Sequence, residues 1–365
     1  MPLNEGDAKP QIKKWLVITL AIVVLLIGGG ITAYVLGVFG ALFPPEETPT
    51  PTPTPVSTPP EEPPPPLPDW PLTGVRGEVV ERAALVVKVE NSEGSRPHEG
   101  LQEADIVFEQ MVEGGISRLI AIYHSTIPTQ IAPIRSVRPM DGPIAAWTHG
   151  VLAFSGGQWQ FTERAEGLGL QLVSYDFGDD GFDWVDWRPS PHDLSGDPAV
   201  FLEQADGDHQ ASPIRFCEID MDEVGGTAQR QGSMTTSIMV EISTVATPHW
   251  QWDPAGTRWL RFEDDDPALT VEGDQLSATN VLVLEVDVRY LSLTDSAGSR
   301  IPEMIVVGEG PGLVATGGRS AEITWKKDSE GGPWRFYDAS GAPVVLAPGN
   351  TWVELVPQSG TWTVS

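Results

Sequence analysis

The alternation of hydrophobic and polar positions separates a membrane segment, a tether and two folded segments. Residues 16–43 are almost entirely apolar and exceed the ~20 residues that a membrane-spanning helix requires. Because Lys9, Lys13 and Lys14 precede this run, the positive-inside rule predicts a cytoplasmic tail over residues 1–15 and extracytoplasmic domains after the helix. A cleaved signal peptide usually has a shorter apolar core of ~7–15 residues. We therefore expect one uncleaved transmembrane helix.

Residues 44–68 consist largely of proline and threonine and include the run Thr48-Pro-Thr-Pro-Thr-Pro-Thr-Pro55. Such a composition cannot bury a hydrophobic core. It favours the extended polyproline II conformation, with a rise of ~3.1 Å per residue and a reach of up to about 75 Å for the whole segment. We expect a stiff linker that holds the folded part away from the membrane.

Residues 69–215 contain apolar runs of strand length between segments of helical period. The expected strands cover residues 83–91, 105–112, 116–124, 151–155 and 170–175, and the expected helices cover residues 140–149, 158–167 and 197–205. Gly114 and Gly115 separate the second and third strands, which is typical of a tight antiparallel hairpin. The mixture predicts an α+β fold, with a mixed α/β domain over this segment.

Residues 216–365 show short alternating strands and no convincing helical period. The expected strands cover residues 236–245, 257–262, 280–290, 321–327 and 351–356. The glycine-rich stretch Gly308–Gly312 is expected to be a turn. This pattern predicts an all-β domain, either a sandwich or an open barrel.

Tryptophans are concentrated in this second segment. They are Trp250, Trp252, Trp259, Trp325, Trp334, Trp352 and Trp362. Aromatic residues in strands usually fill a core or form cross-strand pairs, and we expect that role here. A platform on which a sugar stacks is the functional alternative.

Charge and cysteine content exclude several classes of function. The chain has 51 acidic and 22 basic residues and a formal net charge of −29. A field of that sign repels phosphate backbones, which argues against a broad surface for nucleic acid or anionic lipid. Cys217 is the single cysteine, so an intrachain disulfide and a CxxC metal site are both impossible. It lies in a strand-like run, where we expect a small buried hydrophobe.

Arg135 and Arg138 are the strongest candidates for a binding site, because a guanidinium group offers a rigid, bidentate fork to phosphate or carboxylate. Pro133 and Pro139 bracket this pair, which indicates an ordered loop. The other residues expected to line the site are Arg96, Arg118, Arg188, Glu113, Ser155, Gly156 and Gly157. Internal ion pairs with neighbouring carboxylates are the structural alternative, and the sequence leaves both open.

His192 is the candidate catalytic residue. It lies beside prolines in Arg188-Pro-Ser-Pro-His-Asp193. Asp193 or Asp186 could orient its imidazole, as carboxylates orient catalytic bases. A structural histidine held by hydrogen bonds is the alternative. Serine hydrolysis is disfavoured, because Phe-Ser-Gly-Gly around Ser155 lacks the G-x-S-x-G elbow.

Aspartate-rich stretches at residues 176–180, 206–209 and 263–266 offer the oxygen ligands that Ca²⁺ or Mg²⁺ prefers. None has the twelve-residue spacing of a calcium loop, so we expect solvated turns and no metal site. The sequence contains no P-loop motif, and it identifies no cofactor.

An ordered string of short motifs resembles the YerB-like proteins of the DUF3048 family. The motifs are Asp69-Trp-Pro-Leu-Thr-Gly74, Val89-Glu-Asn91, Arg96-Pro97, Gly100-Leu-Gln-Glu-Ala-Asp105, Val112-Glu-Gly-Gly-Ile-Ser-Arg118, Ala132-Pro-Ile-Arg-Ser-Val-Arg138, Ser155-Gly-Gly157 and Arg188-Pro-Ser-Pro-His-Asp-Leu194. The resemblance implies two consecutive extracytoplasmic domains, over residues 69–215 and 216–365. Family members are often lipoproteins, and no biochemical activity is established for them. This chain differs in having no cysteine near the membrane segment, so we expect the transmembrane helix to replace a lipid anchor.

Three hypotheses for function follow. The first is a membrane-anchored, extracytoplasmic binding or accessory protein of the cell envelope, with an anion held by arginines. The second is an enzyme that processes glycans or phosphoryl groups, with His192 as acid or base and arginines that stabilise negative charge. The third is an adaptor that binds a protein partner. The sequence predicts attachment to a membrane and no nucleic-acid partner.

Overall fold

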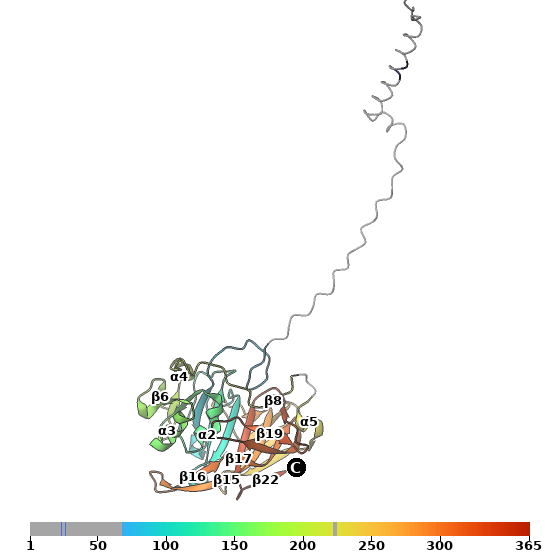
Figure 1. Cartoon of the computed structure of the whole chain (residues 1–365). Helices are drawn as coiled ribbons and strands as arrows, with labels where there is room; N and C mark the ends of the chain where they lie inside the picture. The colour runs from blue at the N-terminus through green and yellow to red at the C-terminus, as the bar shows by residue number, and fades with distance from the viewer. Residues whose placement is uncertain (1–22, 24–25, 27–67, 222–224) are drawn as a thin grey trace, which may run out of the picture. The chain divides into compact units, whose positions relative to one another are not determined.

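A computed structural model describes residues 23, 26, 68–221 and 225–365 of the chain (Figure 1). Apart from Val23, Leu26 and Pro68, the predicted cytoplasmic tail, transmembrane helix and linker lie outside the described residues. No helix among the residues that are described has the length and apolar character needed to cross a membrane. Residues 65–365 form one compact unit, which contains both segments predicted to fold.

The first segment has the predicted mixture of strands and helices. Its strands are β1 (Leu85–Glu90), β2 (Ile106–Met111), β3 (Ser117–Tyr123), β4 (Val151–Phe154), β5 (Gln171–Ser174), β6 (Phe182–Trp184) and β7 (Leu194–Gly196). Its helices are α2 (Asp141–Ala145), α3 (Trp159–Gly167) and α4 (Pro198–Glu203), with 3-10 turns at Glu93–Ser95, Glu113–Gly115, Ala146–Thr148 and Tyr175–Phe177. The predicted β2–β3 hairpin is antiparallel, as expected. β1 pairs antiparallel with β3 and parallel with β4, so the mixed sheet is confirmed.

The second segment is rich in strands. They are β8 (Glu218–Ile219), β9 (Ser233–Met234), β10 (Ser237–Glu241), β11 (Pro248–Asp253), β12 (Arg258–Glu263), β13 (Asp266–Pro267), β14 (Ser277–Ala278), β15 (Asn280–Thr294), β16 (Arg300–Ile305), β17 (Gly308–Thr316), β18 (Arg319–Lys327), β19 (Arg335–Asp338), β20 (Val345–Leu346), β21 (Thr351–Pro357) and β22 (Thr361–Val364). One short helix, α5 (Thr227–Gln231), interrupts them. The all-β expectation is therefore wrong at this point, because five residues are too few to show a helical period.

Strands from both segments form one twelve-stranded sheet, in the order β19-β18-β17-β15-β21-β2-β3-β1-β4-β5, with β16 and β9 attached to β15 and β18. β21 lies between β15 and β2 and pairs parallel with both. Every residue of β21 is buried, as expected for a central strand that is covered on both faces. The two sequence segments are thus joined through this strand, and Figure 1 shows the strands of the two halves together.

The stretch Gly308–Gly312, predicted as a turn, is the first part of β17. It pairs with β18 along its whole length. A Cβ atom at Gly310 would lie 2.7 Å from the indole nitrogen of Trp325, and one at Gly312 would lie 2.6 Å from the carbonyl oxygen of Val283. These glycines therefore allow close approach of neighbours within a sheet, which is a common reason for glycine in a strand.

A second, six-stranded sheet has the order β13-β12-β11-β10-β22, with β14 attached to β12. It packs on the large sheet through aromatic rings, for example Trp250 against Trp352 with centroids 5.3 Å apart. The buried tryptophans of the second segment are Trp250, Trp259, Trp325, Trp334 and Trp352. They fill the core, as predicted, and do not form a sugar platform. Cys217 is partly buried against the same core.

The two faces of β2 have different neighbours, because successive side chains of a strand point to opposite sides of the sheet. Phe108 packs against Trp334, with ring centroids 5.5 Å apart, and Gln110 donates a hydrogen bond to Asp141 at the start of α2. Glu109 points the other way and meets Arg261 of β12. One face of the large sheet is thus covered by α2 and aromatic residues, and the other by the second sheet.

Candidate anion site

Glu90, the last residue of β1, is at the centre of the predicted site. The antiparallel register of β1 and β3 places it opposite Arg118. Its carboxylate is buried and lies 3.2 Å from Nε of Arg135 and 2.9 Å from Nδ1 of His192. Ser92 donates a further hydrogen bond to it. Side chains from the segment after β1 and from two further loops therefore meet at one carboxylate that the sequence analysis did not single out.

The loop that carries Arg135 and Arg138 is fixed between the ends of β1 and β4. The backbone N–H of Arg135 donates to the carbonyl of Lys88 at 2.9 Å, and the N–H of Ser155 donates to the carbonyl of Arg135 at 3.1 Å. Arg138 is paired with Glu113, whose two carboxylate oxygens accept from Nε at 2.7 and 2.8 Å. The ordered loop predicted from the flanking prolines is present, and each of its arginines has a carboxylate partner.

Arg118 is held differently. Its side chain is largely buried, with 8% of the residue exposed. Nη1 donates to the carbonyl of Ser136 at 2.9 Å, whereas Nε is buried and has no hydrogen-bond partner among the residues that the structure describes. Burial, followed by the nearby guanidinium groups of Arg138 and Arg135, lowers the pKa of Arg118 to about 10. Arg118 thus carries a positive charge that its surroundings only partly stabilise.

Lys88, next to Arg118, forms a buried ion pair with Asp141 at 2.9 Å. Arg118 and Arg138 both oppose the positive charge of Lys88, and Arg138 and Arg135 oppose that of Arg118. In a chain with a formal net charge of −29, this group of basic side chains is the opposite of the overall trend.

The sequence suggested that Asp193 or Asp186 orients His192. In the structure its partner is Glu90. Its other ring nitrogen, Nε2, faces the backbone at Gly94, where a Cβ atom would lie only 2.8 Å away. Gly94 therefore leaves just enough room for the imidazole. This arrangement holds the loop at residues 185–193 against the end of β1.

Arg96 and Arg188 do not join the cluster around Glu90. Arg96 forms an ion pair with Glu263 at 2.8 Å. Arg188 donates to the carbonyl oxygens of Ser95 and Pro97. These two arginines fix the loop after β1 from opposite sides, which is a structural role.

The small residues predicted at this site have two roles. Ser155 Oγ lies 3.4 Å from Ser136 Oγ, at the edge of the cluster. Gly156 and Gly157 allow close packing, because a Cβ atom at Gly156 would collide with the carboxylate of Asp176 and one at Gly157 would lie 2.6 Å from a methyl group of Val137. Ser155 can therefore face a ligand, whereas the glycines position the chain.

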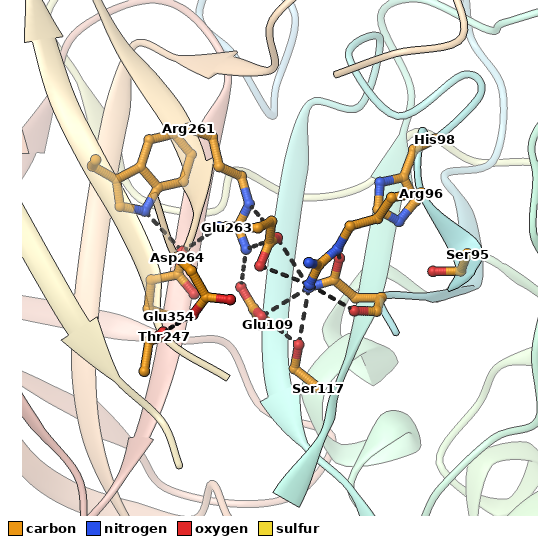
Figure 2. A network of polar contacts seen from close by, with 12 residues as sticks. Ser95, Arg96, His98, Glu109, Ser117, Thr247, Arg261, Glu263, Asp264 and Glu354 are labelled. Atoms are coloured by element: carbon orange, nitrogen blue, oxygen red, sulfur yellow. Dashed lines mark hydrogen bonds and ion pairs between the residues drawn. The ribbon is translucent and has the colours of Figure 1, made fainter. Parts of the chain in front are cut away.

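A second ion cluster, which sequence reasoning missed, lies between the two sheets (Figure 2). Arg261 of β12 is buried and contacts Glu109 at 2.5 Å, Glu263 at 2.7 Å and Glu354 at 2.8 Å. The parallel register of β2 and β21 places Glu109 and Glu354 side by side. Indole Nε1 of Trp250 also donates to Glu354, at 2.9 Å.

The protonation of this cluster follows from its burial. Although burial opposes the charge of Arg261, its three carboxylate neighbours raise the pKa of the guanidinium above its ordinary value. Burial and the adjacent Glu109 carboxylate raise the pKa of Glu354 well above its ordinary value. Burial therefore favours the protonated form of Glu354, while the pKa of Glu109 is lowered and its carboxylate pairs with Arg261.

A signal for this cluster was present in the sequence. In the run Arg258-Trp-Leu-Arg-Phe-Glu263 of β12, a period of two places Arg261 and Glu263 on the same face as Trp259. Charged residues in phase with a buried tryptophan indicate a buried ion pair. The identity of their partners depends on β2 and β21, which are remote in sequence.

No group of three or more His, Cys, Asp or Glu side chains within residues 68–221 and 225–365 is arranged to hold a metal ion. The polar contacts of Arg118, Arg135 and Arg138 and of the Arg261 cluster are ion pairs and hydrogen bonds.

Comparison with known proteins assigns the family. Residues 72–211 match the family described as "Protein of unknown function (DUF3048) N-terminal domain", and residues 238–353 match "Protein of unknown function (DUF3048) C-terminal domain". The chain belongs to the DUF3048 family. It is 25% identical over 307 residues to the protein of Bacillus subtilis (strain 168) described as "Putative lipoprotein YerB", covering 81% of this chain and 88% of that protein.

The crystal structure of YerB from Bacillus subtilis has the same fold. Its TM-score with this DUF3048 chain is 0.68 at 22% sequence identity, over 81% of this chain and 99% of that one. The Arg261 cluster crosses from one DUF3048 domain to the other, because Glu109 lies in the N-terminal match and Arg261 and Glu263 lie in the C-terminal match. The two family domains are therefore bonded to each other through buried charge.

Proposed function

We propose that this DUF3048 protein is a membrane-anchored, extracytoplasmic accessory protein of the cell envelope that binds an anionic ligand through Arg118, Arg135 and Arg138. The ligand class is phosphate or carboxylate, because both accept paired hydrogen bonds from guanidinium groups. The observation that carries the proposal is the buried Arg118, whose Nε has no hydrogen-bond partner in the described part of the chain and whose charge is opposed by Arg138 and Arg135.

The location rests on the relative and on the sequence together. YerB is described as a lipoprotein, and lipoproteins are held at a membrane surface. In this chain Cys217 is the single cysteine and lies in the folded unit. The apolar run 16–43, preceded by lysines, is the proposed anchor in place of a lipid. The folded unit then lies outside the membrane, at the end of the Pro/Thr linker.

The anion follows from electrostatics. An uncompensated charge in a buried position is costly, and the cost falls when an opposite charge with good hydrogen-bond geometry is added. The Arg118 guanidinium, whose charge is opposed by burial, Arg138 and Arg135, is the charge that a bound anion would neutralise. Arg135 is partly exposed and connects the cluster to solvent. A ligand can therefore reach the site from the surface.

The enzymatic alternative, with His192 as acid or base, has weaker support. His192 is paired with Glu90, as a catalytic histidine would be with its orienting carboxylate. However, its free nitrogen is directed at the backbone of Gly94. A reacting group would need that space, so the geometry favours binding over turnover. The adaptor hypothesis has no specific contact in its favour at this site.

Thermal unfolding of the full chain in detergent tests the anion site. Phosphate, citrate and sulfate at about ten times their Kd are expected to raise Tm by about 2–4 °C, because they bind only the folded state. Arg118→Met is expected to abolish this rise. Arg335→Met, at an exposed arginine paired with Asp328, is the matched control and keeps it. If every anion leaves Tm unchanged, or Arg118→Met responds as the wild type does, the site is not an anion site.

Protease treatment of intact cells tests the location. A folded unit outside the membrane is digested without lysis, and the protein stays in the membrane fraction after a high-salt wash. Protection of the folded unit in intact cells would contradict the proposed topology.

A further inference from the structure

The segment between β5 and β7 carries exposed aromatic side chains. Its sequence, Tyr175-Asp-Phe-Gly-Asp-Asp-Gly-Phe-Asp-Trp-Val-Asp-Trp187, alternates aromatic residues with aspartates. Tyr175 is 41% exposed, Trp184 49% and Trp187 54%. Large aromatic side chains usually contribute to a core by burial, as five tryptophans of the second segment do. A group of them on the surface marks an interaction site.

These rings are held in defined positions. Tyr175 and Trp184 meet edge to face, with centroids 5.5 Å apart. The guanidinium carbon of Arg188 lies 4.1 Å from the ring centroid of Trp187. Because Arg188 is itself fixed by two backbone carbonyls, one face of the Trp187 indole is covered. The surface is therefore ordered before any ligand binds.

Backbone hydrogen bonds connect this surface to the anion site. The N–H of Asp176 donates to the carbonyl of Ser155 at 3.2 Å, and the N–H of Ser155 donates to the carbonyl of Arg135 at 3.1 Å. Hydrogen-bonded chains lie ~4.8 Å apart, so two such steps place Tyr175 and Asp176 within about 10 Å of Arg135. That distance is similar to the length of a small sugar phosphate.

The loop between β6 and β7 approaches Arg135 from a second direction. The carbonyl of Pro191 accepts a hydrogen bond from Nη1 of Arg135 at 3.1 Å, and Trp187 belongs to the same loop. The next residue, His192, contacts Glu90. The chain at Tyr175 and the loop that carries Trp187 thus both come close to Arg135 through their backbones.

The combination of groups selects the ligand. The exposed carboxylates of Asp176, Asp183 and Asp186 only accept hydrogen bonds when ionised, so they fit hydroxyl groups. Aromatic rings offer flat apolar faces to the C–H face of a saccharide. The arginines repel a basic peptide. A ligand with an anionic end for the arginines and a hydroxylated ring for the aspartates matches both groups.

We propose that the ligand is a saccharide phosphate, with its phosphate at Arg118 and Arg135 and its ring on Tyr175, Trp184 and Trp187. This inference rests on the anion site proposed above and extends it by a ring subsite. It predicts that the sugar contributes to affinity only when the phosphate is present to anchor it. The ring subsite lies in the N-terminal half of the folded unit, and not among the tryptophans of the second segment.

Isothermal titration of the full chain in detergent tests the ring subsite, with inorganic phosphate, glucose 1-phosphate and glucose as probes. Glucose 1-phosphate is expected to bind at least tenfold more tightly than inorganic phosphate. Trp184→Ala combined with Trp187→Leu is expected to reduce its affinity to that of phosphate while leaving phosphate binding unchanged. Trp159→Ala, at a tryptophan on α3 that is 67% exposed, is the matched control.

The outcomes separate the two proposals. If phosphate and glucose 1-phosphate bind equally well, the ring subsite is wrong and the anion site stands. If the double variant keeps the tighter binding of glucose 1-phosphate, the ring lies elsewhere and this inference is also overturned. If the wild type binds neither inorganic phosphate nor glucose 1-phosphate, the anion site is wrong and the ring subsite is wrong with it. Unchanged Tm values show that the variants are folded.

Discussion

Arg261 and Arg118 are both buried arginines, but their surroundings shift the pKa of the guanidinium in opposite directions. Arg261 contacts three carboxylates between the two sheets, and these neighbours raise the pKa of its guanidinium. Arg118, at the start of β3, donates to the backbone carbonyl of Ser136, and burial with two neighbouring arginines lowers its pKa to about 10. The charge of Arg261 is therefore compensated within the fold, whereas the charge of Arg118 is only partly stabilised by its surroundings.

The energies of the two sites follow from this difference. The lowering of the Arg118 pKa from 12.5 to about 10 corresponds to ~3 kcal/mol of unfavourable interaction in the charged state. Arg261 has no such deficit, because its neighbours offer more negative charge than it carries. A buried ion cluster of that kind adds little net stability compared with an apolar core, yet it is costly to break.

The largest expected effect is at Arg261. Arg261→Met leaves Glu109, Glu263 and Glu354 buried without their cation, and it is expected to lower the free energy of unfolding by ~3–5 kcal/mol. Urea unfolding followed by tryptophan fluorescence measures this. If the methionine variant does not fold, Arg261→Lys is measured instead. Lysine keeps the charge but lacks the rigid fork that reaches three carboxylates, so an intermediate loss of stability is expected.

Arg335→Met provides the comparison for a surface arginine, for which a loss under ~1 kcal/mol is expected. A loss at Arg261 as small as that at Arg335 would mean that the cluster between the sheets does not depend on its charge, and the contrast with Arg118 would disappear.

A smaller effect distinguishes the two glutamates that lie side by side. Because the raised pKa favours the protonated form of Glu354, Glu354→Gln is expected to change the free energy of unfolding by less than ~1 kcal/mol, whereas Glu109→Gln removes the charge paired with Arg261 and costs ~2–4 kcal/mol. Urea unfolding at neutral pH measures both. Equal losses would show that the proton is shared evenly, contrary to the assignment made from burial.

The pH dependence has a definite sign. The pKa of Glu354 is raised in the folded state, so its contribution to stability is fully present below the unfolded pKa of about 4.5 and is lost as pH rises through the folded pKa. The wild type is therefore expected to lose stability relative to Glu354→Gln as pH rises above about 4.5 and towards the raised folded pKa. A difference that is constant over this range would contradict the raised pKa.

Local patterns predicted much of the first segment. The strands β1 to β5 each contain a short apolar run, which a strand pattern detects, and the hairpin at Gly114 and Gly115 is signalled by residue type. The join between the two segments could not be predicted, because β21 pairs with β2 and β15 through contacts that are remote in sequence. The first part of β17 was predicted as a turn because it is rich in glycine. In the structure, Gly310 and Gly312 allow neighbouring atoms to approach closely within the sheet.

The candidate site was predicted in part, for related reasons. The spacing of Arg135 and Arg138 between prolines indicated an ordered loop, and that loop is present. Glu90, at the centre of the cluster, and Glu354, in the other cluster, depend on which strands lie side by side, which no local pattern specifies. Arg96 and Arg188 were grouped with the site by residue type, and their partners are Glu263 and the backbone carbonyls of Ser95 and Pro97, respectively.

The smallest effect on stability is expected at Arg118. Arg118→Met removes ~3 kcal/mol of unfavourable electrostatics, and it also loses one hydrogen bond to the Ser136 carbonyl, worth ~1 kcal/mol, and some packing. We expect the free energy of unfolding to change by less than ~1 kcal/mol or to rise. Urea unfolding in a buffer without phosphate, sulfate or carboxylate measures it. A loss of ~3 kcal/mol or more would place Arg118 with Arg261 as an arginine that the fold requires, and would remove the reason for assigning it a ligand.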